Sequence, residues 1–292
     1  MNIRFGSRES KLAVIQSRMV MEAVQRAFPE ATLELITMKT TGDKILDKTL
    51  EQIGGKGLFV KELDLALREG RCDFTVHSLK DMPMEVPEDL PLAAFSARED
   101  PRDALVLPEG ITEMDRSKPI GCASRRRQLQ LKALYPEYGI QPVRGNVQTR
   151  LRKLDEGQYC ALVLAAAGLK RLGLEQRIHR YFSTEEILPA AGQAILAVQT
   201  RAGADTSLLQ TFHNEDAACC AKAERAFVRQ LNGGCTSPVA AYAQTADEKL
   251  TLTGLYVSED ETILRRGTKT GDKHQAEALG IELARELKGA SL

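Results

Sequence analysis

The residues Ile3-Arg4-Phe5-Gly6-Ser7-Arg8 decide the fold class of this chain. Ile3 and Phe5 flank Arg4 as in a short strand, and a second strand is predicted over residues 33–38. Between them a helix is predicted from about residue 10 to residue 28, with a buried face formed by Leu12, Ile15, Met19, Ala23 and Ala27. This order implies two parallel strands joined by a right-handed crossover. Arg8 then lies at the end of the first strand, where open α/β sheets bind ligands.

Two segments of the chain have the composition of linkers between domains. Residues 98–103 are dense in turn formers and charge, and residues 188–193 form a second candidate. The strand predicted at 195–199 could return to the first domain, and two such crossings are typical of a two-lobed binding protein that closes about a hinge. We expect domain 1 over 1–97 and 194–213, domain 2 over 98–193, and a β3α third domain over 214–292.

Two loops of domain 1 carry candidate functional groups. Residues 40–56 are polar and end near Lys56, and they fit either a solvated surface loop or a mobile lid over a cleft. His77-Ser78-Leu79-Lys80-Asp81-Met82-Pro83 directly follows a strand predicted over 72–76, at a common position for chemistry in doubly wound folds. Asp81 alone could equally cap a helix or form a turn.

Basic residues follow three predicted strands of domain 2. These groups are Ser124-Arg125-Arg126-Arg127, Arg144 to Arg150 with Asn146 as a predicted helix N-cap, and Lys170-Arg171. Clustered arginines are often only a solvated surface. Their recurrence at three strand ends favours an anion-binding cleft, because arginine offers paired donors to carboxylates.

A helix predicted over 216–231 ends at the turn Asn232-Gly233-Gly234-Cys235. Glycines before Cys235 allow a flexible turn that presents the thiol, although an ordinary buried cysteine fits the local sequence as well. The six cysteines show no CxxC spacing and the four histidines no ligand motif, so we expect free thiols and no metal site.

Composition excludes several classes of protein. Lys plus Arg number 40 and Asp plus Glu number 40, so the net charge is zero, and aromatic residues make up only 5%. Both facts argue against a nucleic-acid binder. The 292 residues suggest two or three globular domains, and no apolar run is long enough for a signal peptide or membrane span, so we expect a cytoplasmic protein that binds no membrane.

Taken together, these segments resemble the porphobilinogen deaminase (hydroxymethylbilane synthase) family nearly end to end. The resemblance rests on the order and spacing of several motifs: residues 6–13, 54–62, 77–83, 98–103, 144–146, 167–173 and the Gly-Gly-Cys turn at 233–235. It implies two lobes like periplasmic solute-binding proteins, with mixed doubly wound sheets, and a small C-terminal α+β domain.

The resemblance also implies an activity in tetrapyrrole and haem biosynthesis. A dipyrromethane cofactor would be attached to Cys235 through a thioether. Four porphobilinogen molecules would be condensed head to tail onto it with release of ammonia, and water would free the linear hydroxymethylbilane. The family further suggests a monomer.

Site residues carry over from the family motif by motif. Asp81 matches the catalytic aspartate and contacts the cofactor. The other cofactor-binding positions are Ser78, Lys80, Ser124, Arg126, Arg127 and Arg144. Substrate binding is expected of Arg8, Arg150, Arg171 and, in the lid, Lys56. Arginines suit this role because every pyrrole ring carries an acetate and a propionate.

The sequence departs from the family pattern at two functional segments. Gly121-Cys122-Ala123-Ser124-Arg125 replaces Gly-Thr-Ser-Ser-Leu, which removes two hydroxyls and adds a cation. Gly192-Gln193-Ala194 replaces Gly-Gln-Gly, and we expect a stiffer hinge. At Thr236, which follows Cys235, we expect no consequence.

Two other functions fit part of the sequence. A non-catalytic two-lobed anion-binding protein would explain the lobes and arginines but leaves Cys235 and Asp81 without a role. A nucleic-acid binder could use the basic runs at 125–132, 150–153 and 170–171, against the neutral net charge.

Overall fold

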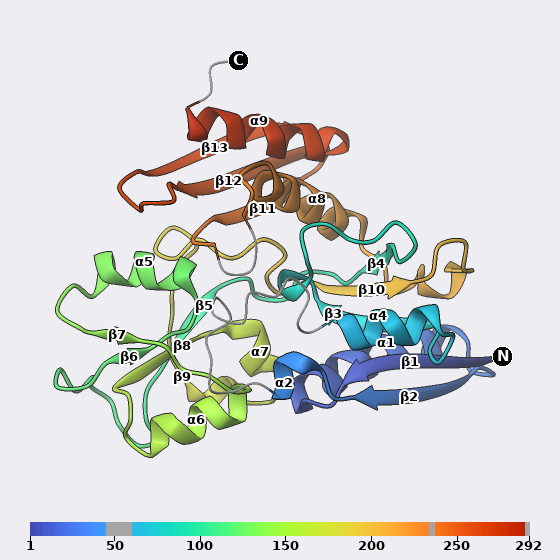
Figure 1. Ribbon diagram of the computed structural model, residues 1–292, viewed down its shortest axis with the longest axis horizontal. Coiled ribbons are helices and arrows are strands. Elements are labelled where there is room, and N and C mark those ends of the chain that lie inside the picture. Colours follow the sequence, from blue (N-terminus) through green and yellow to red (C-terminus); the bar gives the residue numbers. More distant parts are fainter. Residues whose placement is uncertain (45–59, 234–236, 290–292) are drawn as a thin grey trace.

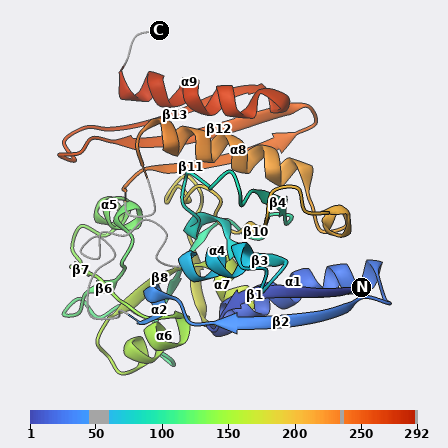
Figure 2. The ribbon, with the colours of Figure 1, turned by 45° about the vertical axis from the view of Figure 1, so that its right-hand side comes forward.

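The computed structural model describes residues 1–44, 60–233 and 237–289. Two five-stranded sheets lie beside each other, and a three-stranded sheet with two long helices stacks against both (Figures 1 and 2). This arrangement confirms the predicted mixed α/β fold with a small C-terminal α+β part.

The first sheet has the strand order β2-β1-β3-β10-β4. Its strands are β1 (Asn2–Arg8), β2 (Thr32–Met38), β3 (Phe74–Ser78), β4 (Leu92–Phe95) and β10 (Leu196–Thr200). β1 pairs in parallel with β2 and β3, as the opening residues predict, and β10 is antiparallel to β3 and β4. The strand after the second crossing therefore does return to the first sheet.

Helices cover both faces of this sheet. Phe5 packs in one core cluster with Val20 and Val24 of α1 (Lys11–Ala27), whereas a Cβ on Gly6 would meet Leu63 of α4 (Lys61–Arg68). Since neighbouring strand residues point to opposite faces, α1 and α4 lie on opposite sides of β1.

The second sheet repeats this topology with the order β7-β6-β8-β5-β9. Its strands are β5 (Asp103–Val106), β6 (Ile120–Gly121), β7 (Ile140–Gln141), β8 (Ala161–Ala165) and β9 (Ile178–Tyr181). Its helices are α5 (Arg125–Leu134), α6 (Val147–Asp155) and α7 (Ala166–Arg171). β5, the first strand after residues 98–102, is antiparallel to β8 and β9. The strand that runs antiparallel between two others is thus β10 in the first sheet and β5 in the second. Each is the first strand after the chain passes from one large sheet to the other.

The third sheet is antiparallel, in the order β11 (Ala240–Ala246), β12 (Lys249–Val257) and β13 (Leu264–Asp272). Helices α8 (Glu215–Gln230) and α9 (Ala276–Lys288) pack on it, with Phe227, Leu252 and Leu283 in one core. The remaining elements are short: α2 (Thr41–Lys44), η1 (Leu79–Asp81), η2 (Glu175–Arg177), η3 (Ser207–Leu209) and η4 (Lys273–Gln275).

Several sequence expectations need correction. The buried residues of α1 are Gln16, Ser17, Val20 and Val24, whereas Met19 is exposed, so the predicted apolar face was wrong. β3 starts and ends two residues later than expected, because Ser78 pairs with Leu196 of β10 and Asp73 instead binds Arg4. α2, α7 and β9 were not predicted. Residues 40–56 were expected to form either a surface loop or a mobile lid, and residues 45–56 of this segment lie outside the described residues.

Candidate active site

A cavity of about 560 Å³ separates the two large sheets. Of the predicted site residues, it brings together Arg8, Ser78, Lys80, Asp81, Ser124, Arg126, Arg127, Arg144, Arg150 and Arg171. The other two predicted residues, Lys56 and Cys235, lie outside the described residues. Ser237 and Val239, which follow Cys235 in the chain, line the same cavity.

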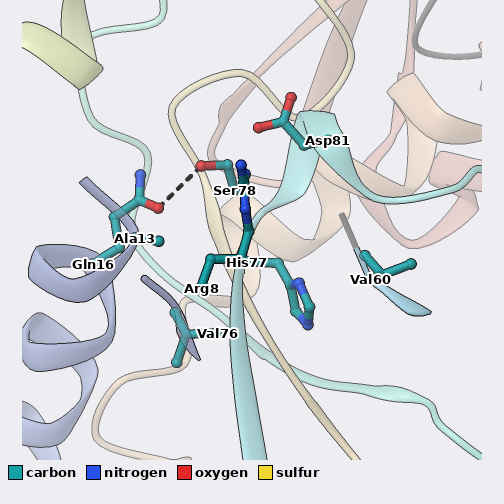
Figure 3. Close-up of a pocket in the computed structure, with 8 residues that line it drawn as sticks. All are labelled: Arg8, Ala13, Gln16, Val60, Val76, His77, Ser78 and Asp81. Carbon is teal, nitrogen blue, oxygen red and sulfur yellow. Dashed lines mark hydrogen bonds between the residues drawn. The ribbon is translucent and has the colours of Figure 1, made fainter. Parts of the chain in front are cut away.

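The wall on the side of the first sheet is built from the ends of β1 and β3. These neighbouring parallel strands end at the same edge, so Arg8, the last residue of β1, lies near Ser78, the last residue of β3. The Ser78 hydroxyl donates to Oε1 of Gln16 on α1 (3.1 Å; Figure 3). The turn η1 then carries Lys80 and Asp81.

Asp81 lines a second, smaller cavity of about 30 Å³. Arg8, Gln16, Ser78 and Asp81 line both cavities, so the smaller one is a side pocket of the larger. In Figure 3 the His77 ring points away from the Asp81 carboxylate. Asp81 is exposed and also lines the larger cavity.

Lys80 lies in a more buried position than Asp81. Burial lowers the pKa of Lys80 to about 8, Arg127 adds to this effect, and Asp81 and Asp103 oppose it. Its ammonium donates to Oε1 of Gln193 (3.4 Å). A lysine with such a pKa changes charge close to the physiological range.

On the second wall, Arg126 and Arg127 share one buried carboxylate. Nη2 of Arg126 donates to Oδ2 of Asp103 (2.8 Å), and Nη2 of Arg127 donates to Oδ1 (2.7 Å). Burial alone would raise the pKa of Asp103, but the two guanidinium groups hold the pKa well below its usual range. Asp103 therefore stays ionised. Nη1 of each arginine donates to a backbone carbonyl, that of Leu188 for Arg126 (2.6 Å) and that of Val163 for Arg127 (3.3 Å).

Three further arginines complete this wall. Burial lowers the pKa of Arg150 and of Arg171 to about 10, with the cation of Arg127 contributing at Arg150. Nε of Arg150 donates to the Gly145 carbonyl (2.8 Å) and Nη2 of Arg171 to the Ala194 carbonyl (2.6 Å). Nε of Arg171 is buried without a hydrogen-bond partner among the described residues. Arg144 lines the cavity beside them, and Asn146 caps α6 as predicted.

The departures from the family pattern fall in different places. Cys122 is buried and its thiol donates to the Ser124 carbonyl (3.8 Å), whereas Ala123 lines the cavity. Arg125 is exposed and pairs with Glu261 of the third sheet's hairpin (2.6 Å), so it is not part of the cavity wall. Ala194 adopts a left-handed backbone, with φ of 73°.

Sequence reasoning missed four residues of the site. Gln16, Lys39 and Gln193 line the cavity, while Asp103 binds two of its arginines. Lys39 directly follows a predicted strand, and Asp103 and Gln193 lie in segments of the family pattern, whereas Gln16 had no such signal. The described residues contain no group of three or more His, Cys, Asp or Glu side chains placed to hold a metal ion.

Family models cover most of the chain. One, described as "Porphobilinogen deaminase, dipyromethane cofactor binding domain", matches residues 3–210, and a second, for the C-terminal domain of the same enzyme, matches residues 218–289. The chain belongs to the porphobilinogen deaminase family. This family condenses porphobilinogen into hydroxymethylbilane and is a family of transferases that carry a dipyrromethane cofactor.

Relatives with this name are similar over their whole length. The porphobilinogen deaminase of Acetivibrio thermocellus is 58% identical over 291 residues, which cover 99% of each chain. That of Chromobacterium violaceum is 47% identical over 98% of this chain and 94% of the relative. Among solved structures, the periplasmic aliphatic sulphonate binding protein SsuA from Escherichia coli matches 79% of this chain and 70% of its own, with 12% identity and a TM-score of 0.41.

The donor set of the cavity suits the cofactor of this family. A dipyrromethane carries four carboxylates, and the wall offers guanidinium and ammonium groups, the Ser124 side chain and the buried Nε of Arg171. No helix of the described residues is long and apolar enough to cross a bilayer.

Proposed function

We propose that the cavity between the two large sheets is the active site at which porphobilinogen units are joined, with Asp81 as the catalytic residue. One observation carries the proposal: Asp81 lines a cavity at which, among the described residues, the other charged side chains are all cationic apart from Glu9. Carboxylates of a ligand can be held by the cations, while Asp81 is left for the chemistry.

Asp81 would act on the pyrrole that reacts. Loss of ammonia from porphobilinogen leaves a cation spread over the ring and its methylene group. An ionised carboxylate next to the pyrrole N–H stabilises that charge. After the new carbon–carbon bond forms, the same carboxylate can accept the proton that is lost as the ring regains aromaticity.

The basic residues would bind the acetate and propionate groups. We assign Ser78, Lys80, Ser124, Arg126, Arg127 and Arg144 to the cofactor, and Arg8, Arg150, Arg171 and Lys56 to the incoming substrate and growing chain. Loss of one buried contact between an arginine and a carboxylate costs on the order of 2–5 kcal/mol, which is enough to stall elongation at one chain length.

Cys235 is the proposed point of attachment. The dipyrromethane, when bound, supplies the pyrrole end to which the first porphobilinogen is joined. Ser237 and Val239, two and four residues beyond Cys235 in the chain, lie in the cavity wall, which supports this assignment. The predicted domains 1–97 with 194–213, 98–193 and 214–292 give the two lobes and the unit that carries this anchor.

A monomeric state and a cytoplasmic location stay predictions for this chain. Light scattering on the purified protein tests the first, and we expect the mass of one chain.

The role of Asp81 is tested by Asp81→Asn. The amide keeps the size of the side chain but cannot stabilise a cation by charge or accept a proton, so we expect a folded protein that binds pyrroles and forms product at least about a hundredfold more slowly. Production of hydroxymethylbilane is followed by absorbance after cyclisation and oxidation. A near-normal rate would remove Asp81 from the mechanism.

Intact-protein mass spectrometry tests the anchor. The wild-type protein should carry a covalent mass of two pyrrole rings, and Cys235→Ser should lack it. Cys220→Ser is the matched control, because Cys220 is buried in α8 away from the cavity, and it should keep the adduct. An active wild-type protein with an unmodified mass would disprove the assignment.

A further inference from the structure

Gln193 lies where the two crossings between the large sheets meet, and its side chain is fully buried. Its backbone N–H donates to the Ala190 carbonyl (2.9 Å) in the second crossing. Its own carbonyl accepts from Nη1 of Arg98 (3.0 Å) in the first crossing. The backbone of this one residue therefore ties the two crossings together.

The side-chain amide of Gln193 has a partner for each of its functions. Nε2 donates to the Pro101 carbonyl (2.7 Å) and to Oδ1 of Asp103 (2.9 Å), while Oε1 accepts from the Lys80 ammonium (3.4 Å). Only an amide can donate twice on one side and accept on the other. A carboxylate would repel Asp103, and an apolar side chain would remove three hydrogen bonds, to the Pro101 carbonyl, Asp103 and Lys80, from a buried place.

The partners of this amide belong to the two walls of the cavity: Lys80 lines it, and Asp103 is bound to two arginines that line it. Lys80 precedes Asp81 in the turn η1, on the wall of the first sheet. Asp103 holds the guanidinium groups of Arg126 and Arg127 on the opposite wall. Gln193 is thus hydrogen-bonded both to the lysine beside the carboxylate and to the aspartate beneath the arginines.

We propose that Gln193 is a positioning residue of the condensation reaction, which sets the place of the Lys80 ammonium relative to Asp81 and of Asp103 relative to Arg126 and Arg127. The inference rests on the proposed function of the cavity. Gln193 lines the cavity beside these groups, and its proposed role is carried by its hydrogen bonds to Lys80 and Asp103.

The contact with Lys80 makes this role measurable. The charged groups that act on Lys80 are Arg127, Asp81, Asp103 and Arg126. Lys80 is charged below its pKa and loses its charge as pH rises through that value, so carboxylate binding by Lys80 weakens on the alkaline side. Gln193→Glu places a carboxylate on the ammonium and raises this pKa, whereas Gln193→Met removes the hydrogen bond from the ammonium to Oε1 of residue 193.

The experiment compares kcat/KM for porphobilinogen across the alkaline range in the cofactor-loaded enzymes. In the wild type we expect kcat/KM to fall at high pH as Lys80 loses its charge, and we call this fall the alkaline limb. For Gln193→Glu we expect the alkaline limb to move to higher pH than in the wild type, by roughly one pH unit. For Gln193→Met we expect a limb that does not move up and a kcat lower by roughly tenfold to a hundredfold, because the reacting groups are misplaced. Lys80→Gln should lack this limb altogether.

Gln199→Glu is the matched control. Gln199 lies in β10 and is also fully buried. Its side-chain amide donates to the Leu90 carbonyl and is hydrogen-bonded neither to Lys80 nor to Asp103. It should lower the melting temperature and keep the alkaline limb of the wild type.

Three results would overturn the proposal: an unmoved limb in Gln193→Glu, an equal upward shift in Gln199→Glu, or a limb that persists in Lys80→Gln. If Gln193→Glu does not fold, Gln193→Met decides alone, and wild-type kcat in that variant overturns the proposal. The role of Asp81 is tested separately by Asp81→Asn, so failure of the proposed function is distinguishable from failure of this inference.

Discussion

Ala194 holds a backbone conformation that favours glycine. Its φ is 73°, and the family pattern has glycine at this position. A Cβ in the left-handed region costs roughly 1–2 kcal/mol. The residue also lies in the cavity wall, and its carbonyl accepts from Arg171 and from the backbone of Glu99, so the strained conformation is held by contacts from both sides of the crossing.

We therefore expect Ala194→Gly to raise the free energy of unfolding by about 0.5–1 kcal/mol, since relief of the strain outweighs the greater entropy of the unfolded glycine chain. Urea-induced unfolding measures the change. The reverse substitution, Gly203→Ala, is the control and should destabilise by a similar amount, because Gly203 has φ of 77° and open space where a Cβ would lie. A destabilised Ala194→Gly would show that the alanine is not strained.

The chemistry of single residues was largely predictable from the sequence, but their pairing was not. Cations at strand ends predicted an anion-binding wall, because parallel strands end at one edge. That Asp103 binds both Arg126 and Arg127 depends on the packing of the first residue of β5 against the first turn of α5. In the sequence Asp103 was only one more turn former.

At the scale of elements, α8 and α9 pack unusually closely at Gly280. A Cβ there would lie 2.3 Å from the Ala223 carbonyl oxygen and 2.9 Å from the Phe227 nitrogen. Both are backbone atoms of α8, so they cannot move aside as a side chain could. Glycine at this position therefore sets the distance between the two helices of the third sheet.

Gly280→Ala should accordingly destabilise the protein by roughly 3 kcal/mol through overpacking. Helix propensity alone predicts the opposite sign, a gain of about 1 kcal/mol. Thermal unfolding by circular dichroism distinguishes the two. Gly168→Ala in α7 serves for comparison, because its added carbon would meet only Leu12 at 3.6 Å, an ordinary contact, and should cost little.

The periodicity of apolar residues was not sufficient to predict the buried face of α1 or the presence of strand β9. The apolar stripe of α1 predicted a core face with Met19, but the buried face carries Gln16 and Ser17. Gln16 is buried because its side-chain oxygen accepts a hydrogen bond from Ser78 and the residue lines the cavity. This polar contact overrides the hydrophobic pattern. Strand β9, with the pattern Ile-His-Arg-Tyr, is an edge strand and gives no apolar run.

At the scale of the whole molecule, the third sheet is fastened to the junction of the other two. The buried carboxylate of Glu224 in α8 accepts from Arg98 (2.6 Å), from the Gly192 N–H (2.7 Å) and from the Ala243 N–H (2.7 Å). Turn formers predict linkers at 98–103 and 188–193. Their attachment to a glutamate near the far end of the chain was not predictable, because a charged residue in an amphipathic helix is normally exposed.

Charge is distributed unevenly although the net charge is zero. The cavity gathers cations from both sheets, and the compensating acidic residues lie mostly elsewhere on the molecule. A cleft lined by one sign of charge focuses the field and speeds the association of oppositely charged ligands. Porphobilinogen, with two carboxylates and one ammonium, has a net negative charge, so the cleft should attract it.

Salt should then weaken capture of the substrate. We expect kcat/KM to fall severalfold as ionic strength rises from about 20 mM to about 300 mM, while kcat changes little. Lys39→Gln should reduce this slope, since Lys39 is an exposed cation at the cavity. Lys249→Gln should leave it unchanged, because Lys249 is an exposed lysine of the third sheet away from the cavity. Equal slopes in the wild type and both variants would mean that capture depends on contacts inside the cleft and not on its long-range field.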